Sequence, residues 1–320
     1  MNEHSFQRRL IQAAVAACFA TAVHANPAGP SVVSGAATFN AVGKNLTVTN
    51  SPGAIINWQG FSIRADEVTR FIQSGAASAV LNRVTGAEHS QLLGQLLSNG
   101  KVFLINPNGV TIGAGARIDT AGFVASSLAL SNEDFLAGKF RFTDPGHAGK
   151  VTNAGTISAH SGGPVYLVAP TVENHGVITA PNGDVMLAAG KSVELVSAAS
   201  PHLRVQVQAG GDALNVGQLV AESGRVGLYG AAVRNGGLIS ADSAQVTAAG
   251  TVVLRASRDV TLDATSVVAA SGAQGGSVHV QAEQGTLLAD GRIEANGAVA
   301  RGGEVKLLGE QVGLVGRAAV

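Results

Sequence analysis

A unit of about 20 residues recurs along the second half of the chain, and this repeat limits the possible folds more than any other feature. Each unit opens with a glycine and continues with alternating apolar residues, as in Gly163-Pro164-Val165-Tyr166-Leu167 and Gly183-Asp184-Val185-Met186-Leu187. The next clear start is Gly224, 41 residues after Gly183, which is close to two such units. A period of two residues is typical of β-strands, and a period near 20 indicates one supersecondary unit per repeat. We therefore expect three short strands and three turns in each unit.

The repeat predicts an all-β fold, a right-handed parallel β-helix in which each coil stacks on the last. With coils about 4.8 Å apart, roughly 295 mature residues predict about 14 coils and a rod of about 65 Å. Asn-x-Gly triplets start at Asn153, Asn174 and Asn235, and asparagines at one coil position are expected to form a hydrogen-bonded ladder. An antiparallel sandwich is the weaker alternative, because Asn-Gly turns between long strands are scarce.

The residues before the repeat have a different composition, with most of the aromatic side chains between residues 32 and 145. Stacked coils have open ends that favour aggregation, so we expect this atypical segment to form an N-terminal cap with short extra-helical strands. The expected organisation is a signal peptide at 1–25, a capped part at 26–150, and β-helix repeats at 151–320. Residues 88–97 fit either a short helix or an apolar strand.

The N-terminus is typical of an export signal. Arg8 and Arg9 precede an apolar run, and Val23-His24-Ala25 forms a small-residue cleavage site, so we expect cleavage between Ala25 and Asn26. The only cysteine, Cys18, lies inside this signal. The mature chain would therefore enter an oxidising compartment without a thiol, which suits a chain that must later cross a second membrane unfolded.

The composition and the charge pattern argue against several functions. Charged residues make up 13% of the chain and the formal net charge is zero, so nucleic-acid binding is not expected. The acidic pairs Asp66-Glu67 and Glu133-Asp134 are isolated, and neighbouring strand residues point in opposite directions. The histidines lack the spacing of metal ligands. We expect no enzyme activity, cofactor or metal, although a secreted β-helix that binds or cleaves polysaccharides is the alternative function.

One turn stands out in the N-terminal part. Asn106, Pro107, Asn108 and Gly109 follow an apolar strand, and each residue type suits a sharp turn: proline fixes φ, asparagine tolerates the left-handed region, and glycine adopts it without strain. A second polar stretch lies upstream and consists of Asn82, Arg83, Val84, Thr85 and Gly86. We expect the functional unit to be the capped start of the β-helix, with the turn at one corner and residues 82–86 beside it.

Together with their surroundings, these stretches carry a family resemblance. The runs at 54–63, 79–86, 99–113 and 122–128 resemble the secretion domain of two-partner secretion exoproteins of the filamentous haemagglutinin type, most closely the high-molecular-weight adhesins. The family motif Asn-Pro-Asn-Gly corresponds to residues 106–109. A second family motif, Asn-Pro-Asn-Leu, is absent, and the corresponding stretch is Phe71-Ile72-Gln73-Ser74-Gly75.

The resemblance implies export of an adhesin-like protein. It also implies a secretion domain that continues to about residue 250 and is followed by the start of the exoprotein rod. The expected partner is an outer-membrane two-partner secretion transporter whose periplasmic domains recognise the N-terminal region and pass the unfolded chain outward. The expected location is the surface or the medium of a Gram-negative bacterium, reached through the periplasm. Because family members usually continue into an effector region, two alternatives are open at Val320: either downstream sequence that could bind host-cell or surface glycans is missing, or a short secreted domain is the whole product.

Overall fold

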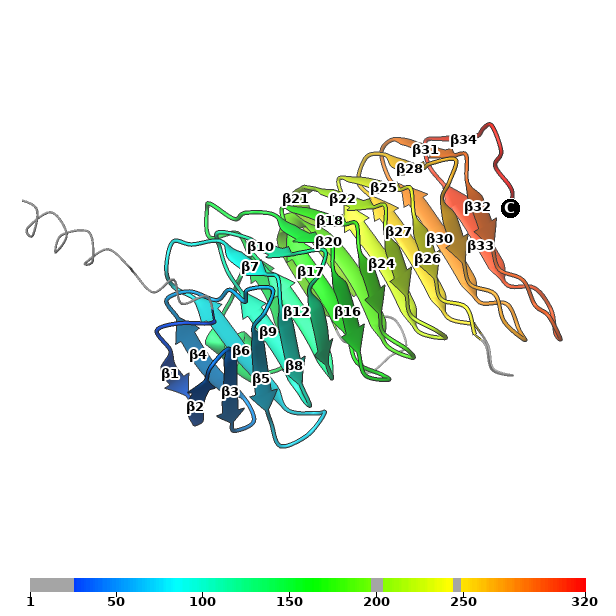
Figure 1. Ribbon diagram of the computed structural model, residues 1–320. Helices are drawn as coiled ribbons and strands as arrows, with labels where there is room; N and C mark the ends of the chain where they lie inside the picture. The colour runs from blue at the N-terminus through cyan, green and yellow to red at the C-terminus, as the bar shows by residue number, and fades with distance from the viewer. Residues whose placement is uncertain (1–25, 197–203, 244–248) are drawn as a thin grey trace, which may run out of the picture.

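The computed structural model describes residues 26–196, 204–243 and 249–320, which form a parallel β-helix, as the repeat predicted. Figure 1 shows the coils stacked along one axis from the N-terminal cap to the C-terminus. Three sheets run along this axis. The predicted signal peptide and Ala25 lie outside the described residues, so the cleavage site stays a prediction.

The strands are assigned to the sheets as follows. Sheet 1 runs in the order β1 (Ser31–Ser34), β4 (Ala54–Trp58), β6 (Ala79–Val84), β9 (Lys101–Ile105), β12 (Gly122–Ser126), β17 (Val165–Ala169), β20 (Asp184–Val196), β24 (Arg225–Gly230), β27 (Thr251–Ala256), β30 (Ser277–Ala282) and β33 (Glu304–Leu308). Sheet 2 contains β7 (Ser90–Leu92), β10 (Val110–Ile112), β15 (Val151–Asn153), β18 (Thr171–Asn174), β22 (Asp212–Asn215), β25 (Ala232–Asn235), β28 (Val260–Leu262), β31 (Thr286–Ala289) and β34 (Gln311–Leu314). Sheet 3 contains β2 (Ala37–Val42), β3 (Asn45–Asn50), β5 (Val68–Ile72), β8 (Gln95–Ser98), β11 (Arg117–Thr120), β16 (Thr156–Ala159), β19 (Val177–Thr179), β23 (Gln218–Val220), β26 (Leu238–Ser240), β29 (Val267–Ala269) and β32 (Arg292–Glu294).

The N-terminal end is capped, as predicted. Strand β1 pairs antiparallel with β4, and β2 pairs antiparallel with β3, whereas the coils themselves pair in parallel. Residues 88–97 contain the strands β7 and β8, so the strand alternative was correct. The sheets continue across residue 150, because β10 pairs with β15 and β12 pairs with β17. The domain boundary expected there stays a prediction.

The repeated glycines form one corner of the stack. A Cβ atom on Gly183 would lie 2.1 Å from the carbonyl oxygen of Gly163, and one on Gly224 would lie 2.0 Å from that of Gly183. Real Cβ contacts are never this short, so successive coils can approach at this corner only without a side chain. This close approach explains why each unit opens with glycine.

One expectation from the repeat spacing was wrong. The 41 residues between Gly183 and Gly224 form one coil, since Asp184 pairs directly with Arg225 in sheet 1. The extra length is an excursion in which β20 leaves the stack and returns through β21 (Arg204–Gly210). Sheet 1 has 11 strands in its main order, of which β1 is antiparallel, and this leaves 11 − 1 = 10 parallel strands. The stack is therefore shorter than the predicted 14 coils.

The predicted asparagine ladder is present and buried. Asn153 Nδ2 donates to Asn174 Oδ1 at 2.8 Å, and Asn174 Nδ2 donates to Asn215 Oδ1 at 2.8 Å. The ladder ends with a 2.7 Å bond from Asn215 to Asn235. Asn215 was not recognised in the sequence, although Asn215-Val216-Gly217 has the same triplet pattern. Each amide gains a partner from a neighbouring coil, and the last one, Asn235, donates to the carbonyl oxygen of Gly237, so these polar groups can be buried without leaving an unpaired donor.

A second apolar core lies outside the helix. An extra-helical sheet made of β13 (Ala129–Leu130), β14 (Phe140–Thr143), the end of β20 and β21 packs over the outer face of sheet 1, with α2 (Asn132–Leu136) beside it. Strands under this cover are buried on both faces: all five residues of β12 and of β17 are buried, and Ser126 is the one polar side chain among them apart from the hydroxyl of Tyr166. Beyond the cover, β27 alternates between buried and more exposed residues. Unbroken apolar runs were therefore the sequence signal for the covering layer.

Candidate functional site

The side chain of Asn106 is at the centre of the turn at residues 106–109. It is fully buried, and its Nδ2 donates to the carbonyl oxygen of Glu88 and to Ser90 Oγ, both at 2.9 Å. Its Oδ1 accepts from the backbone N–H of Asn108 at 3.0 Å and from Asn108 Nδ2 at 3.1 Å. A buried amide with four partners fixes the turn to the coil beneath it.

The rest of the turn is tightly enclosed. Gly109 has a φ of 104°, and its N–H donates to the carbonyl oxygen of Asn106 at 2.9 Å. A Cβ atom on Gly109 would lie 2.7 Å from the carbonyl oxygen of Lys150, so both the backbone angle and the space favour glycine. Pro107 and Asn108 are half-buried, and the carbonyl oxygen of Pro107 accepts from Gly149 at 2.8 Å.

The structure brings the two polar stretches together, as expected. Asn108 Nδ2 donates to the carbonyl oxygen of Gly86 at 3.0 Å. Gly86 packs so closely that a Cβ atom there would lie 2.0 Å from the carbonyl oxygen of Gln59. His89 adds a further link that was missed in the sequence, because its Nδ1 lies 2.9 Å from the carbonyl oxygen of Asn108. Residues 82–86 and 106–109 therefore form one corner of the stack, which we call the motif corner.

Most of the upstream stretch also has structural contacts. Asn82 is fully buried: its Oδ1 accepts from Trp58 Nε1 at 2.9 Å, and its Nδ2 donates to the carbonyl oxygen of Phe103 at 3.2 Å. Val84 lies in the helix core. Thr85 is exposed, although its Oγ1 donates to the carbonyl oxygen of Trp58 at 3.1 Å.

Arg83 links the motif corner to the extra-helical sheet. Its Nη2 donates to the carbonyl oxygen of Leu130 in β13 at 2.8 Å. Burial lowers the pKa of the Arg83 guanidinium, and the nearby carboxylate of Glu133 partly opposes this shift. The contact explains why a charged residue lies in an otherwise apolar and amide-rich region: its head group satisfies a carbonyl at the end of the short strand.

The acidic pairs have structural partners of their own. Asp66 forms an ion pair with Lys44, and Glu67 accepts from the backbone N–H of Arg64 at 2.8 Å. Glu133 and Asp134 lie in the first turn of α2, where Ser131 Oγ accepts from the N–H of Asp134.

The remaining polar and glycine-rich stretches of the described chain form no further site. Residues 113–115 form a corner, in which the N–H of Ala116 donates to the carbonyl oxygen of Gly113. Among the described residues, no group of three or more histidine, cysteine or acidic side chains is arranged to hold a metal ion.

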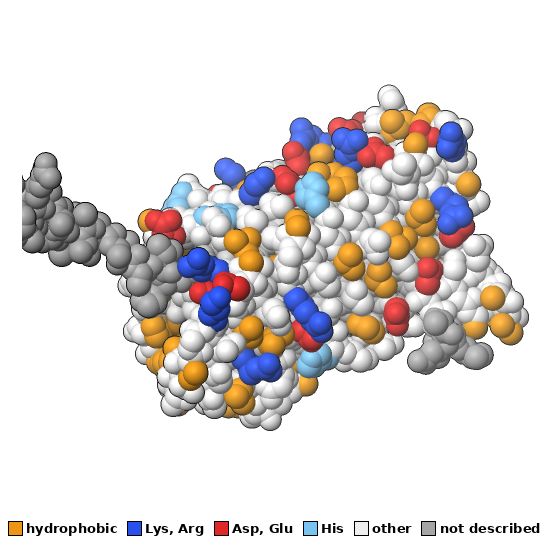
Figure 2. Space-filling model, in the orientation of Figure 1, with side chains coloured by type: hydrophobic (Ala, Val, Ile, Leu, Met, Phe, Trp, Pro, Cys, Tyr) orange, Lys and Arg blue, Asp and Glu red, His pale blue; other side chains and the backbone are white. Residues whose placement is uncertain are grey.

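Charge and hydropathy add little to the site. Figure 2 shows acidic and basic side chains mixed over the visible face, in agreement with the zero net charge of the chain. In the part of the chain that the structure describes, no helix has the length and apolar character needed to cross a membrane.

Comparison with known protein families decides the identity of this fold. A family model described as the TPS secretion domain matches residues 23–307, which is most of the chain. The chain belongs to the two-partner secretion family. Its matched region is the TPS secretion domain, the part of such exoproteins that serves as the secretion signal.

Solved and curated relatives agree with this assignment. The crystal structure of the HMW1 secretion domain from Haemophilus influenzae superimposes with a TM-score of 0.75 and 30% identity, and the match covers 92% of this chain and 98% of that chain. This match confirms the expected likeness to the high-molecular-weight adhesins. A heme/hemopexin-binding protein of H. influenzae strain Rd is 37% identical over 174 residues, or 51% of this chain and 19% of that protein. A second H. influenzae protein of the same name is 39% identical over 93 residues, covering 29% of this chain and 10% of that protein. The chain thus spans at most about a fifth of these curated relatives.

Proposed function

We propose that an outer-membrane transporter recognises residues 82–86 and 106–109 in the periplasm before this TPS secretion domain folds. The observation that carries the proposal is the burial of Asn82 and Asn106, neither of which has an exposed side chain in the β-helix. A partner that binds these amides must therefore meet them in an unfolded or partly folded chain. After transport, folding would bury them against the neighbouring coils and remove them from the partner.

Burial of side chains during folding would also give transport a direction. Each added coil buries apolar side chains along one continuous core, which favours the folded state by about 25 cal/mol for each Å² of apolar surface removed from water. A chain that folds only outside the cell cannot easily return through a narrow pore. Folding at the surface would thus make export effectively irreversible, and the product would lie on the cell surface or in the medium of a Gram-negative bacterium.

The proposal is limited to transport. Binding of host-cell or surface glycans was expected for sequence beyond Val320, and no observation on the described residues supports it. The heme/hemopexin-binding names of the curated relatives refer to proteins of which this chain covers 19% or less. We therefore propose no effector activity for this domain.

Secretion assays with two matched variants test the proposal. Asn106→Ala removes a buried amide from the motif corner, whereas Asn174→Ala removes an equally buried amide from the middle of the ladder, outside that corner. Both variants and the unmodified chain are expressed with and without the cognate transporter, and the yield in the medium is measured. We expect Asn106→Ala to lower transporter-dependent yield at least about tenfold more than Asn174→Ala. Equal losses would assign Asn106 a folding role alone, and equal yields without the transporter would disprove transporter-dependent export.

A further inference from the structure

The layer that covers sheet 1 stops before sheet 1 does. The extra-helical sheet has the order β13, β14, β20 and β21, and both Val205 of β21 and Tyr229 of β24 belong to the second core. Sheet 1 continues beyond this point through β27, β30 and β33. Val253 of β27 is only partly buried at the margin of the second core. The outer face of sheet 1 at β27, β30 and β33, which we call the floor, is therefore available to a further covering strand. The described residues provide no strand above it.

The margin of the covering sheet is an unprotected strand edge. Strand β21 pairs with β20 on one side, and no strand of the described chain pairs with its other side. Apart from Arg204 at its first position, β21 contains no charged residue and no proline, which are the features that usually protect sheet edges. An edge of this composition has backbone donors and acceptors free to pair with another extended segment.

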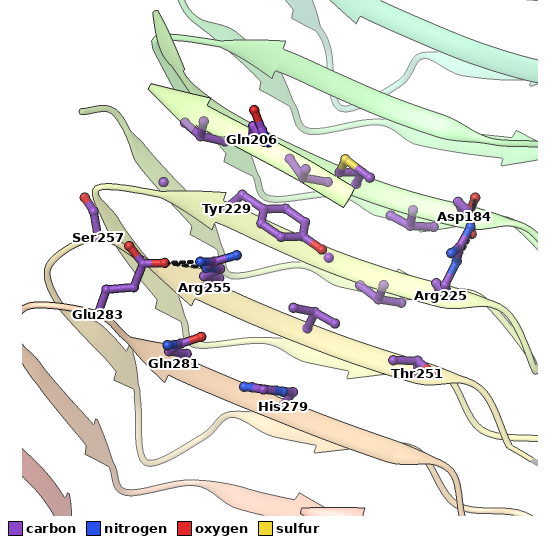
Figure 3. Close-up of a pocket in the computed structure, with 18 of the residues that line it drawn as sticks. Asp184, Gln206, Arg225, Tyr229, Thr251, Arg255, Ser257, His279, Gln281 and Glu283 are labelled. Atoms are coloured by element: carbon purple, nitrogen blue, oxygen red, sulfur yellow. Dashed lines mark hydrogen bonds and ion pairs between the residues drawn. The ribbon is translucent and has the colours of Figure 1, made fainter. Parts of the chain in front are cut away.

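A groove of about 660 Å³ lies between this edge and the floor. Its lining includes Gly227, Val253 and His279, and β21 forms its wall. Figure 3 shows the ion pairs Asp184–Arg225 and Arg255–Glu283 on opposite sides of Tyr229. His279 Nε2 is buried with no hydrogen-bond partner among the described residues.

We propose that this groove binds an extended, uncharged segment of a partner polypeptide, which adds as a fifth strand beside β21. Adjacent strands lie about 4.8 Å apart and packed sheets about 10 Å apart, so a strand added at this edge would lie above the outer face of β27 and β30. Alternate side chains of the segment would then cover Val253 and its neighbours. An uncharged segment fits because each arginine at the groove already has a carboxylate partner, and an added charge would be left unpaired.

A second folded copy of this chain does not fit the same edge. Two copies that pair through β21 in an antiparallel arrangement would be related by a two-fold axis perpendicular to the joined sheet, and both β-helices would lie on the same side of it. Because β27, β30 and β33 continue under the groove, the coils of one copy would occupy the space needed by the other. The occupant is therefore a single extended segment.

The test uses a fluorescein-labelled peptide with alternating valine and threonine, titrated with the folded chain. We expect saturable binding by fluorescence anisotropy, together with slower amide hydrogen exchange in residues 204–210. Val253→Glu introduces a charge in the floor and is expected to weaken binding at least about tenfold. Leu288→Glu is the matched control, because Leu288 is an exposed strand residue in sheet 2, away from the groove, and binding should change less than about twofold.

Three results would overturn the proposal. These are the absence of peptide binding to the folded chain, binding without protection of residues 204–210, and equal effects of the two substitutions. Light scattering of the unliganded chain provides the remaining check. A dimer that disappears on addition of the peptide would identify a second copy as the occupant and would also contradict the proposal.

Discussion

Two asparagines of the same motif have different surroundings. Asn106 is fully buried and has four side-chain hydrogen bonds, whereas Asn108 is half-buried and donates to Gly86 and Asn106. A buried polar group that loses its partner destabilises a protein by about 1–3 kcal/mol. The motif therefore contains one residue that stabilises the fold and one that remains partly accessible.

We expect Asn106→Ala to lower the free energy of unfolding by about 2–4 kcal/mol and Asn108→Ala by about 1 kcal/mol. Urea unfolding of the purified domain measures both, and Trp58 is a suitable probe because it is the only tryptophan and is buried beside Asn82. An equal loss for the two variants would mean that burial does not distinguish their roles.

The two tyrosines of the chain provide a test of burial through pH. Burial raises the pKa of Tyr229 to about 12, and burial, followed by the charge of Asp184, raises the pKa of Tyr166 well above its usual value. Unfolded tyrosine ionises near pH 10, so above that pH the unfolded state binds fewer protons than the folded state and stability falls as pH rises. We expect tyrosinate absorbance to appear only together with unfolding. Ionisation of either residue in a chain that keeps its β-sheet circular dichroism would contradict this prediction.

At the scale of elements, the asparagine ladder couples coils that lie far apart in sequence. Asn174 bonds to Asn153 on one side and to Asn215 on the other, whereas Asn235 ends the ladder, next to Leu262 in the following coil. We expect Asn174→Ala to destabilise the domain by about 2–3 kcal/mol and Asn235→Ala by roughly half as much. Chemical denaturation of both variants measures the difference in unfolding free energy. A larger loss for Asn235→Ala than for Asn174→Ala would disprove the expectation that an interior asparagine of the ladder contributes more than the last one.

The cap is a second element with a separable role. Strands β1 and β2 pair with β4 and β3 and cover the first edge of the stack. Removal of residues 26–42 would expose those edges to other chains. We expect this deletion to form soluble oligomers or aggregates detectable by light scattering, with parallel β-structure retained in the later coils. If the deletion variant is monomeric and as stable as the full chain, the cap does not protect the edge.

Features that depend on patterns within one short segment could be predicted from the sequence, whereas contacts between distant segments could not. Glycine spacing, alternating apolar residues and Asn-x-Gly triplets are local signals, and they predicted the β-helix and the ladder. Residues 88–97 did not distinguish a helix from a strand, because so short an apolar run fits both periods. The coil from Gly183 to Gly224 was misjudged because a long excursion and two short coils have the same length. The contact of Asn108 with Gly86 and the role of His89 depend on stacking of distant segments, so only the proximity of the two motifs was predictable.

At the scale of the whole molecule, the folded shape conflicts with passage through a pore. The described chain is a continuous stack in which sheet 1, sheet 2 and sheet 3 each join the first coils to the last (Figure 1). Asn82 and Asn106 of the motif corner are buried within the first coils. These features support the proposal that this TPS secretion domain is recognised and transported before it folds, and the absence of cysteine after Cys18 keeps the predicted mature chain free of disulfide loops.

An engineered disulfide tests this central claim most directly. Thr179 and Val220 are Cα partners on neighbouring strands of sheet 3 and are 41 residues apart in the sequence, so Thr179→Cys with Val220→Cys can form a disulfide that closes a large loop. Secretion of the double variant through the cognate transporter is measured in an oxidising periplasm and again with a reductant, with each single variant as a control. We predict retention of the oxidised double variant in the periplasm, and normal yield on reduction and for both single variants. Secretion of the oxidised double variant at the normal yield would contradict transport before folding.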